Sequence, residues 1–134
     1  MAATVTYKDI EKKLKVFKEG FNPSEIPYII LGAFGTSDNY IRRFKEGKGV
    51  VARFDGLMIK GKIAYHQTDT YHMTEELERM KKDDNIRKAA PRIIMVSDGM
   101  AVLAYDPKED IDNRMKITHV WLLLKLLLKN NQYS

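Results

Sequence analysis

The 134-residue sequence contains no cysteine. Its fold therefore cannot depend on disulfide bonds or on thiolate-ligated zinc, and secreted disulfide scaffolds are excluded. The first residues lack the apolar core of a signal peptide. The longest apolar stretch, residues 120–128, includes Lys125 and is far shorter than the roughly 20 residues that span a bilayer. These absences predict a cytoplasmic protein without a membrane partner.

Sequence signatures of enzymes are missing as well. There is no GxSxG nucleophile motif, no phosphate-binding P-loop and no GxGxxG dinucleotide motif. A restriction-type nuclease would carry Glu-x-Lys on a strand after Asp55, but the strand predicted at residues 62–66 leads into Gln67 and Thr68. We therefore predict that the protein is not an enzyme and needs no cofactor.

Two histidines raise the question of a metal site. His66 and His72 flank Asp69, and imidazole with carboxylate suits transition metals. On loop or strand backbone this spacing imposes no ligand geometry. We therefore predict no metal site.

The residues that are present indicate an α+β fold. Apolar residues make up 44% of the chain, which is enough for one core. Helical spacing of apolar residues, with caps and glycine stops, predicts N-terminal helices at residues 7–19, 24–34 and 37–46. The second helix ends at Leu31 or Phe34, and Thr36 or Ser37 caps the third. A further helix begins with Thr74 as its cap and fades near residue 82, before a polar stretch at residues 81–88.

Short β-rich segments predict a small antiparallel sheet built from hairpins. They lie at residues 50–54, 57–59, 62–66, 92–97 and 100–105. The pair Asp98-Gly99 between two apolar runs is typical of a type I′ hairpin turn. We predict a domain at residues 1–110, followed by a C-terminal segment at 111–134 that is helical from about residue 111 to 129.

The C-terminal segment is rich in leucine. A helix there would be apolar on most sides and could not stand alone in water. It either packs into the domain core or pairs with the same helix of another chain. Its position and its few charges favour the second, as a homodimer or homotetramer. The predicted oligomerisation residues are Ile117, Val120, Trp121, Leu124, Leu127 and Leu128.

Positive charge is concentrated in one part of the sequence. The formal net charge is +5, and residues 42–62 alone hold seven basic and two acidic residues. Aromatic residues interleave with these cations, a mixture that suits single-stranded nucleic acid, because cations follow phosphates while rings stack on unpaired bases. The alternative is that Phe44 and Phe54 are core and the lysines a solvated face. The predicted binding residues are Tyr40, Arg42, Arg43, Lys45, Lys48, Arg53, Lys60, Lys62 and Tyr65.

The helices at residues 24–34 and 37–46 are also typical of a helix-turn-helix. Gly35 would lie in the turn, Ser37 would cap the recognition helix, and its groove-facing residues would be Asn39, Tyr40, Arg42 and Arg43. Leu31, four residues before the turn glycine, departs from the small residue that this motif needs. A duplex-binding regulator is therefore one alternative function, and an adaptor that binds other proteins is another.

In organisation, length and charge placement, the sequence resembles the ThermoDBP and ThermoDBP-related family of archaeal single-stranded-DNA-binding proteins. The resemblance covers nearly the whole chain: a basic α+β domain followed by a leucine-rich helix. It implies sequence-independent binding of single-stranded DNA, or of RNA, in a basic cleft by an oligomer. Tyr40 and Tyr65 would be stacking platforms. The implied phosphate contacts are Arg42, Arg43, Lys48, Arg53, Lys60 and Lys62.

A second resemblance covers residues 24–107. The strings NPSEIPYIILGAFG, RRFKEGKG and PRIIMVSDGMAVLAYDPK are similar to the N-terminal module of certain restriction-modification DNA methyltransferases. That module carries neither the methyl-donor site nor the catalytic motif. This resemblance implies a DNA-handling module and leaves its binding mode open.

Overall fold

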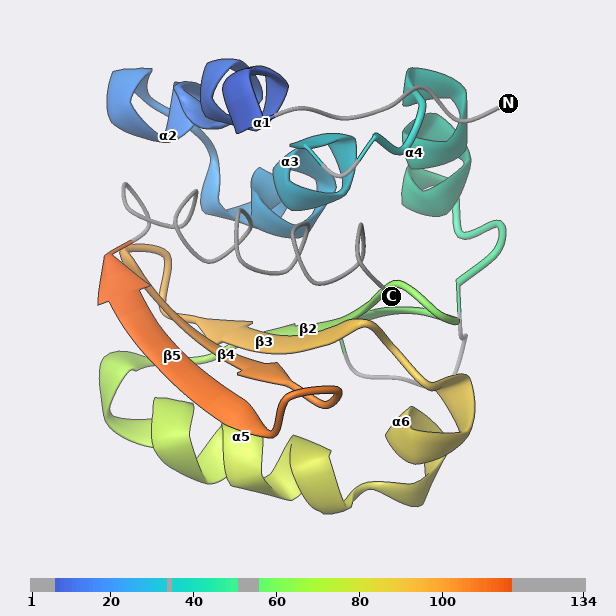
Figure 1. Cartoon of the computed structure of the whole chain (residues 1–134), viewed down its shortest axis with the longest axis vertical. Helices are drawn as coiled ribbons and strands as arrows, with labels where there is room; N and C mark the ends of the chain where they lie inside the picture. The colour runs from blue at the N-terminus through green and yellow to red at the C-terminus, as the bar shows by residue number, and fades with distance from the viewer. Residues whose placement is uncertain (1–6, 34, 51–55, 117–134) are drawn as a thin grey trace.

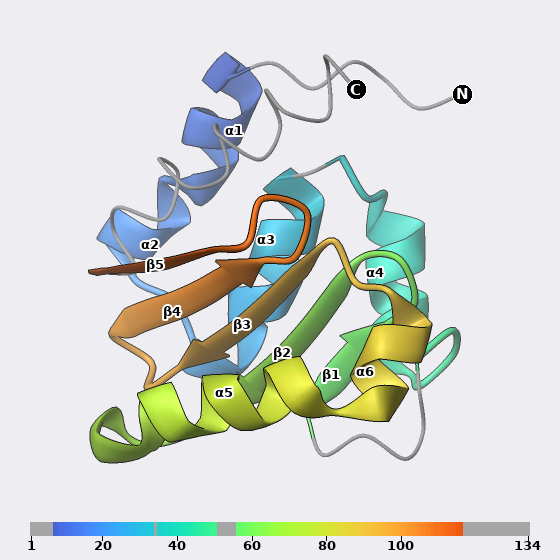
Figure 2. The same cartoon turned by 60° about the horizontal axis from the view of Figure 1, so that its bottom comes forward.

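The structure, a computed structural model, describes residues 7–33, 35–50 and 56–116. A five-stranded sheet lies between two layers of helices (Figure 1). Helices α1 to α4 cover one face of the sheet, and α5 and α6 cover the other (Figures 1 and 2). The prediction of an α+β fold is confirmed at this level.

The N-terminal layer consists of short helices. The helix predicted at residues 7–19 is divided at Lys15, and Gly20 ends it by donating its N–H to the Val16 carbonyl. Asn22, rather than Ser24, caps the next turn by accepting the Ser24 N–H. The elements are α1 (Tyr7–Leu14), α2 (Val16–Glu19), the 3-10 turn η1 (Pro23–Glu25), α3 (Ile26–Ala33) and α4 (Asp38–Lys45).

The sheet is mixed, so the prediction of an antiparallel sheet is wrong at one pairing. Strand order follows the sequence, and only β2 and β3 are parallel, with Ile63 opposite Ile93. The strands are β1 (Leu57–Ile59), β2 (Ile63–Gln67), β3 (Ile93–Ser97), β4 (Ala101–Asp106) and β5 (Ile111–Lys116). Turn signals reveal only local pairings, whereas a parallel pair needs a long crossover connection.

That crossover consists of η2 (Thr70–His72), α5 (Met73–Lys82) and α6 (Asp84–Ala89). Thr74 lies inside α5 rather than at its cap. Helix α6 occupies part of the polar stretch at residues 81–88, for which we predicted no element. The Asp83 carboxylate caps it by accepting the N–H groups of Asn85 and Ile86. Ala90 then ends α6 in the left-handed conformation.

The hairpin between β3 and β4 is confirmed, but its turn is not type I′. Ser97 pairs with Val102, so four residues separate the last paired positions of the two strands. A type I′ turn needs positive φ at two consecutive residues, and only Gly99 has it here. The Asp98 carboxylate instead accepts the N–H groups of Met100 and Ala101 at 2.8 Å each.

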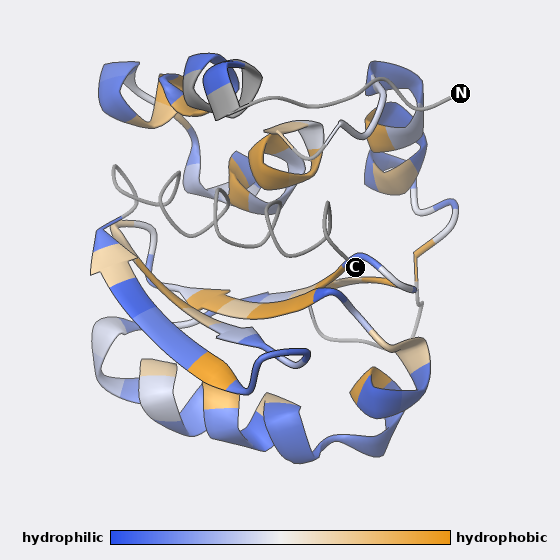
Figure 3. Cartoon of the chain, in the orientation of Figure 1, coloured by the Kyte–Doolittle hydropathy of each residue, from blue (hydrophilic) through white to orange (hydrophobic). Residues whose placement is uncertain are grey.

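The predicted start of the last helix is wrong. Residues 111–116 form strand β5, which pairs antiparallel with β4 at the edge of the sheet. Strand β5 is mostly hydrophilic (Figure 3), as expected for an edge strand. The predicted oligomerisation residues lie outside the described residues: Ile117, Val120, Trp121, Leu124, Leu127 and Leu128.

Each face of the sheet has its own apolar core. On the side of α1 to α4, Phe17, Ile30 and Phe44 pack against Ile63 and Met95. On the other side, residues of α5 and α6 pack against the opposite faces of the same strands. That second cluster consists of Met58, Ala64, Met73, Leu77, Met80, Ile86, Ala89, Ile94, Val96 and Leu103. Helices cover both faces of the sheet. Side chains that point to opposite faces along a strand are therefore buried on either side.

Candidate nucleic-acid interface

Helix α4 places three of the predicted cations. The Ser37 hydroxyl caps it by accepting the Tyr40 N–H at 3.3 Å. Phe44 is buried and anchors the inner side of the helix. Arg42, Arg43 and Lys45 are exposed. The helix therefore presents an outward basic face, as the sequence predicted.

Tyr40 is the exposed aromatic residue of this face. Its side chain is 57% exposed, and its ring centroid lies 6.3 Å from that of Phe44. The Cζ atom of Arg43 lies 5.9 Å from the Tyr40 ring centroid, close enough for a cation–π contact. The structure thus brings together one accessible ring and one guanidinium.

The cations of this region differ in their partners. Lys45 forms an ion pair with Glu25 at 2.8 Å and lies 5.1 Å from the Tyr28 ring centroid. Lys48 lies 3.6 Å from Glu46. Among the described residues, Arg42 and Arg43 have no carboxylate partner; Arg42 donates instead to the Asn39 side chain at 2.6 Å. Within the described ranges, these two arginines are therefore available to an anionic ligand.

Lys60 and Lys62 lie on the turn between β1 and β2. Gly61 between them has φ of +75°, and Lys62 donates its N–H to the Ile59 carbonyl at 3.0 Å. Both lysine side chains are exposed and lack a carboxylate partner within the described ranges. The turn and α4 lie at the same end of the sheet (Figures 1 and 2). We name Tyr40, Arg42, Arg43, Lys60 and Lys62 the basic surface.

Lys45 and Lys48, which pair with glutamates, are left out of the basic surface, and so is Tyr65. Tyr65 is only 5% exposed and belongs to the core on the α3 side of the sheet. Burial raises its pKa to about 12. Its ring would have to leave the core before it could stack on a base. Arg53 lies outside the described residues.

The histidines do not form a metal site in the described part of the chain. His72 Nδ1 lies 2.6 Å from Asp69, and this contact raises the pKa of His72 and lowers that of Asp69. His66 Nδ1 lies 3.2 Å from Glu76 instead. In the same ranges, no three His, Asp or Glu side chains come close enough to hold a metal ion.

No helix among the described residues is long and apolar enough to cross a membrane.

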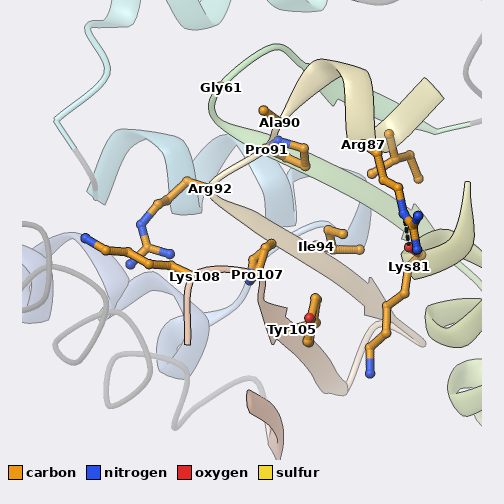
Figure 4. Close-up of a pocket in the computed structure, with 11 residues that line it drawn as sticks. Gly61, Lys81, Arg87, Ala90, Pro91, Arg92, Ile94, Tyr105, Pro107 and Lys108 are labelled. Carbon is orange, nitrogen blue, oxygen red and sulfur yellow. Dashed lines mark hydrogen bonds between the residues drawn. The ribbon is translucent and has the colours of Figure 1, made fainter. Parts of the chain in front are cut away.

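Sequence reasoning missed a second group of cations. They line a cavity of about 530 Å³, where the β1–β2 turn, the link from α6 to β3 and the β4–β5 turn meet (Figure 4). The cations are Lys81, Arg87, Arg92 and Lys108. Residues 81–92 are rich in basic side chains, which is a signal for this group. We had described residues 81–88 only as a polar stretch.

Comparison with known proteins identifies no relative: no family model, curated protein or solved structure matches this chain. The resemblances to ThermoDBP and to the methyltransferase module therefore stay predictions. Any proposal about function must therefore be argued from the geometry and the charge of the described surface.

Proposed function

We propose that this protein binds single-stranded nucleic acid without sequence preference. One observation carries the proposal: the exposed Tyr40 ring lies beside Arg43, on a helix whose two arginines have no described carboxylate partner. A ring that accepts a base and cations that accept the flanking phosphates are what a single strand requires.

The same geometry explains why sequence would matter little. Every base has an aromatic face that can stack on Tyr40, and every nucleotide carries the same phosphate. Lys60 and Lys62 extend the cationic path beyond α4 at the same end of the sheet (Figure 1). Ion contacts to phosphates release counterions, so affinity falls with salt, with a slope near −0.7 per neutralised phosphate on single strands.

Self-association would place two or more copies of this site in one oligomer. The leucine-rich segment, residues 117–134, is the proposed interface for a homodimer or homotetramer. Two linked sites on one strand raise the apparent affinity without any new contact, provided the strand can span them. Size-exclusion chromatography with light scattering measures the mass, and alanine at Leu124 and Leu127 should reduce it to that of a monomer.

Fluorescence anisotropy tests the proposal. A labelled mixed-sequence oligonucleotide is titrated as a single strand and then annealed to its complement, at low and at physiological salt. We expect tighter binding to the single strand and a steep loss with salt. Absence of binding to either form would contradict the proposal and leave the protein-interaction adaptor as the function.

One observation favours a second candidate, the helix-turn-helix duplex binder. Gly32 of α3 lies against α4, where an added Cβ would be 3.5 Å from Ile41 Cδ1. The two helices are therefore in van der Waals contact at this point, as this motif requires, although Leu31 is buried nearby where a small residue is expected. Preference for the duplex in the same titration, with dependence on its sequence, would establish this alternative.

A further inference from the structure

The cavity beside Tyr105 has an apolar floor. Ile94, Pro91, Pro107 and Tyr105 line it, and its volume of about 530 Å³ falls in the range of small-molecule sites. Figure 4 shows Ile94, Pro107 and Tyr105 in the middle of the cavity. Ile94 and the two prolines suit a flat, weakly polar ring, whereas the Tyr105 ring has the Lys81 ammonium 4.4 Å from its centroid.

Cations lie on two sides of this floor. Arg92 and Lys108 lie on one side, and Lys81 and Arg87 lie on the other (Figure 4). A ligand that fills the cavity would therefore meet positive charge at both ends. That arrangement differs from a site for one anion, where cations converge on one point.

A buried carboxylate positions the first side. Asp106 is 5% exposed and accepts an Arg92 Nη1–H at 2.7 Å. It also accepts the Lys108 backbone N–H at 2.9 Å. One acidic group thereby fixes both the arginine and the turn that carries the lysine. The Lys108 side chain is exposed and has no carboxylate partner within the described residues.

The second side combines a neutralised cation with an available one. Lys81 pairs with Glu78 at 2.9 Å and Asp112 at 2.7 Å. Burial opposes the charge of Lys81, but these carboxylates outweigh it and raise its pKa. Arg87 donates its Nε–H to the Lys81 carbonyl at 3.2 Å, and no described carboxylate pairs with it. Each side of the cavity thus offers one cation without an acidic partner.

We propose that this cavity binds one nucleotide of a nucleic-acid strand, with its base on the apolar floor and a phosphate at each side. Arg87 holds one phosphate and Lys108 the other. The inference rests on the proposed function for the class of ligand, and it adds a separate site for it.

The chemistry of a strand matches this arrangement. Each internal nucleotide has a phosphate on both its 5′ and its 3′ side, whereas a free monophosphate has one. Gly61 lines the cavity, and its neighbours Lys60 and Lys62 belong to the basic surface. A strand that follows these lysines reaches the cavity next.

Isothermal titration calorimetry with thymidine 3′,5′-bisphosphate tests the inference. We expect the bisphosphate to bind about tenfold more tightly than thymidine 5′-monophosphate, because each charged hydrogen bond contributes roughly that factor. Arg87→Ala and Lys108→Ala should each weaken the bisphosphate about tenfold. Both side chains are exposed, so neither substitution should unfold the protein.

A matched control, Lys18→Ala on α2, also removes one exposed positive charge and should leave bisphosphate binding unchanged. The inference is overturned if the bisphosphate does not bind, if inorganic phosphate binds as tightly, or if Arg87→Ala and Lys108→Ala bind normally. An oligonucleotide that binds while the bisphosphate fails would reject this site and retain the proposed function. Bisphosphate binding without oligonucleotide binding would reject the proposed function and, with it, the assignment of this cavity to a nucleotide of a strand.

Discussion

Helices α4 and α5 both carry several charged residues, yet they use them differently. On α5, Arg79 pairs with Glu76 one turn earlier and approaches Asp83, while Lys81 pairs with Glu78 and with Asp112 of β5. The charges of α5 are therefore largely satisfied within the fold. Such pairs typically stabilise a helix by a few tenths of a kcal/mol each.

On α4, by contrast, the cations outnumber the acids that could satisfy them. Asp38 is the only acidic residue of the helix, against three basic ones. Lys45 pairs with Glu25 of η1, while Arg42 and Arg43 contact an amide and an aromatic ring instead. The lesson is that two helices with three basic residues each can use them differently. Cations with partners inside the fold contribute to stability, and cations without a described carboxylate partner are candidates for binding a ligand.

The largest expected effect on binding comes from removing the two arginines of α4. Replacing both Arg42 and Arg43 with alanine should weaken single-strand binding about a hundredfold at low salt, because two charged contacts to phosphates are lost. Anisotropy measures the affinity. The matched control is Arg79→Ala on α5, which should bind normally. Equal losses in both variants would contradict the contrast.

Tyr40→Ala should weaken binding by about 1–3 kcal/mol, the range for one base stacked on an aromatic ring. The control is Tyr71→Ala, because Tyr71 is 89% exposed but lies outside the basic surface. The same anisotropy titration measures the affinity of both variants for the single strand. If the two variants behaved alike, stacking on Tyr40 would be rejected.

A change on α5 should affect stability and leave binding intact. Glu76→Gln weakens the contacts of this half-buried carboxylate with Arg79 and His66. We expect the free energy of unfolding to fall by about 1 kcal/mol, measured by urea denaturation. Arg42→Ala should leave the unfolding free energy nearly unchanged. A stability loss at Arg42 larger than at Glu76 would reverse the proposed roles.

The smallest effect concerns Asp98, at the opposite end of the sheet from the basic surface. The Ala101 and Met100 N–H groups lower the pKa of its carboxyl. A lowered pKa stabilises the fold above the unfolded-state value of about 4, and the contribution disappears as pH falls through the folded-state pKa. The free energy of unfolding falls as the pH is lowered, and Asp98→Asn should reduce this loss by about 1 kcal/mol or less. Oligonucleotide affinity at neutral pH should stay unchanged.

Local signals predicted much of this fold. Ser37 and Gly47 bracket α4, and two apolar runs around Asp98-Gly99 locate the β3–β4 hairpin. These features depend on neighbours in sequence, which is why residue patterns reveal them. The parallel pairing of β2 with β3 depends on a crossover of more than twenty residues, and no local pattern encodes it.

The errors have physical causes at identifiable residues. Tyr65 was expected at the surface because strand alternation separates two faces, but helices cover both. Residues 111–116 were joined to the leucine-rich segment, although their polar composition suits an exposed edge strand. Asp83 and its helix were missed within a polar stretch, and with them Arg87 and its cavity.

The salt dependence of single-strand binding tests the contrast between α4 and α5 most directly. The logarithm of the binding constant is measured against the logarithm of salt concentration for three proteins: the wild type, the variant lacking Arg42 and Arg43, and Arg79→Ala. Each lost phosphate contact should reduce the slope by about 0.7, so the double variant should be shallower by about 1.4. Arg79→Ala should match the wild type. Equal slopes in all three proteins would contradict the assignment of α4 to phosphate binding.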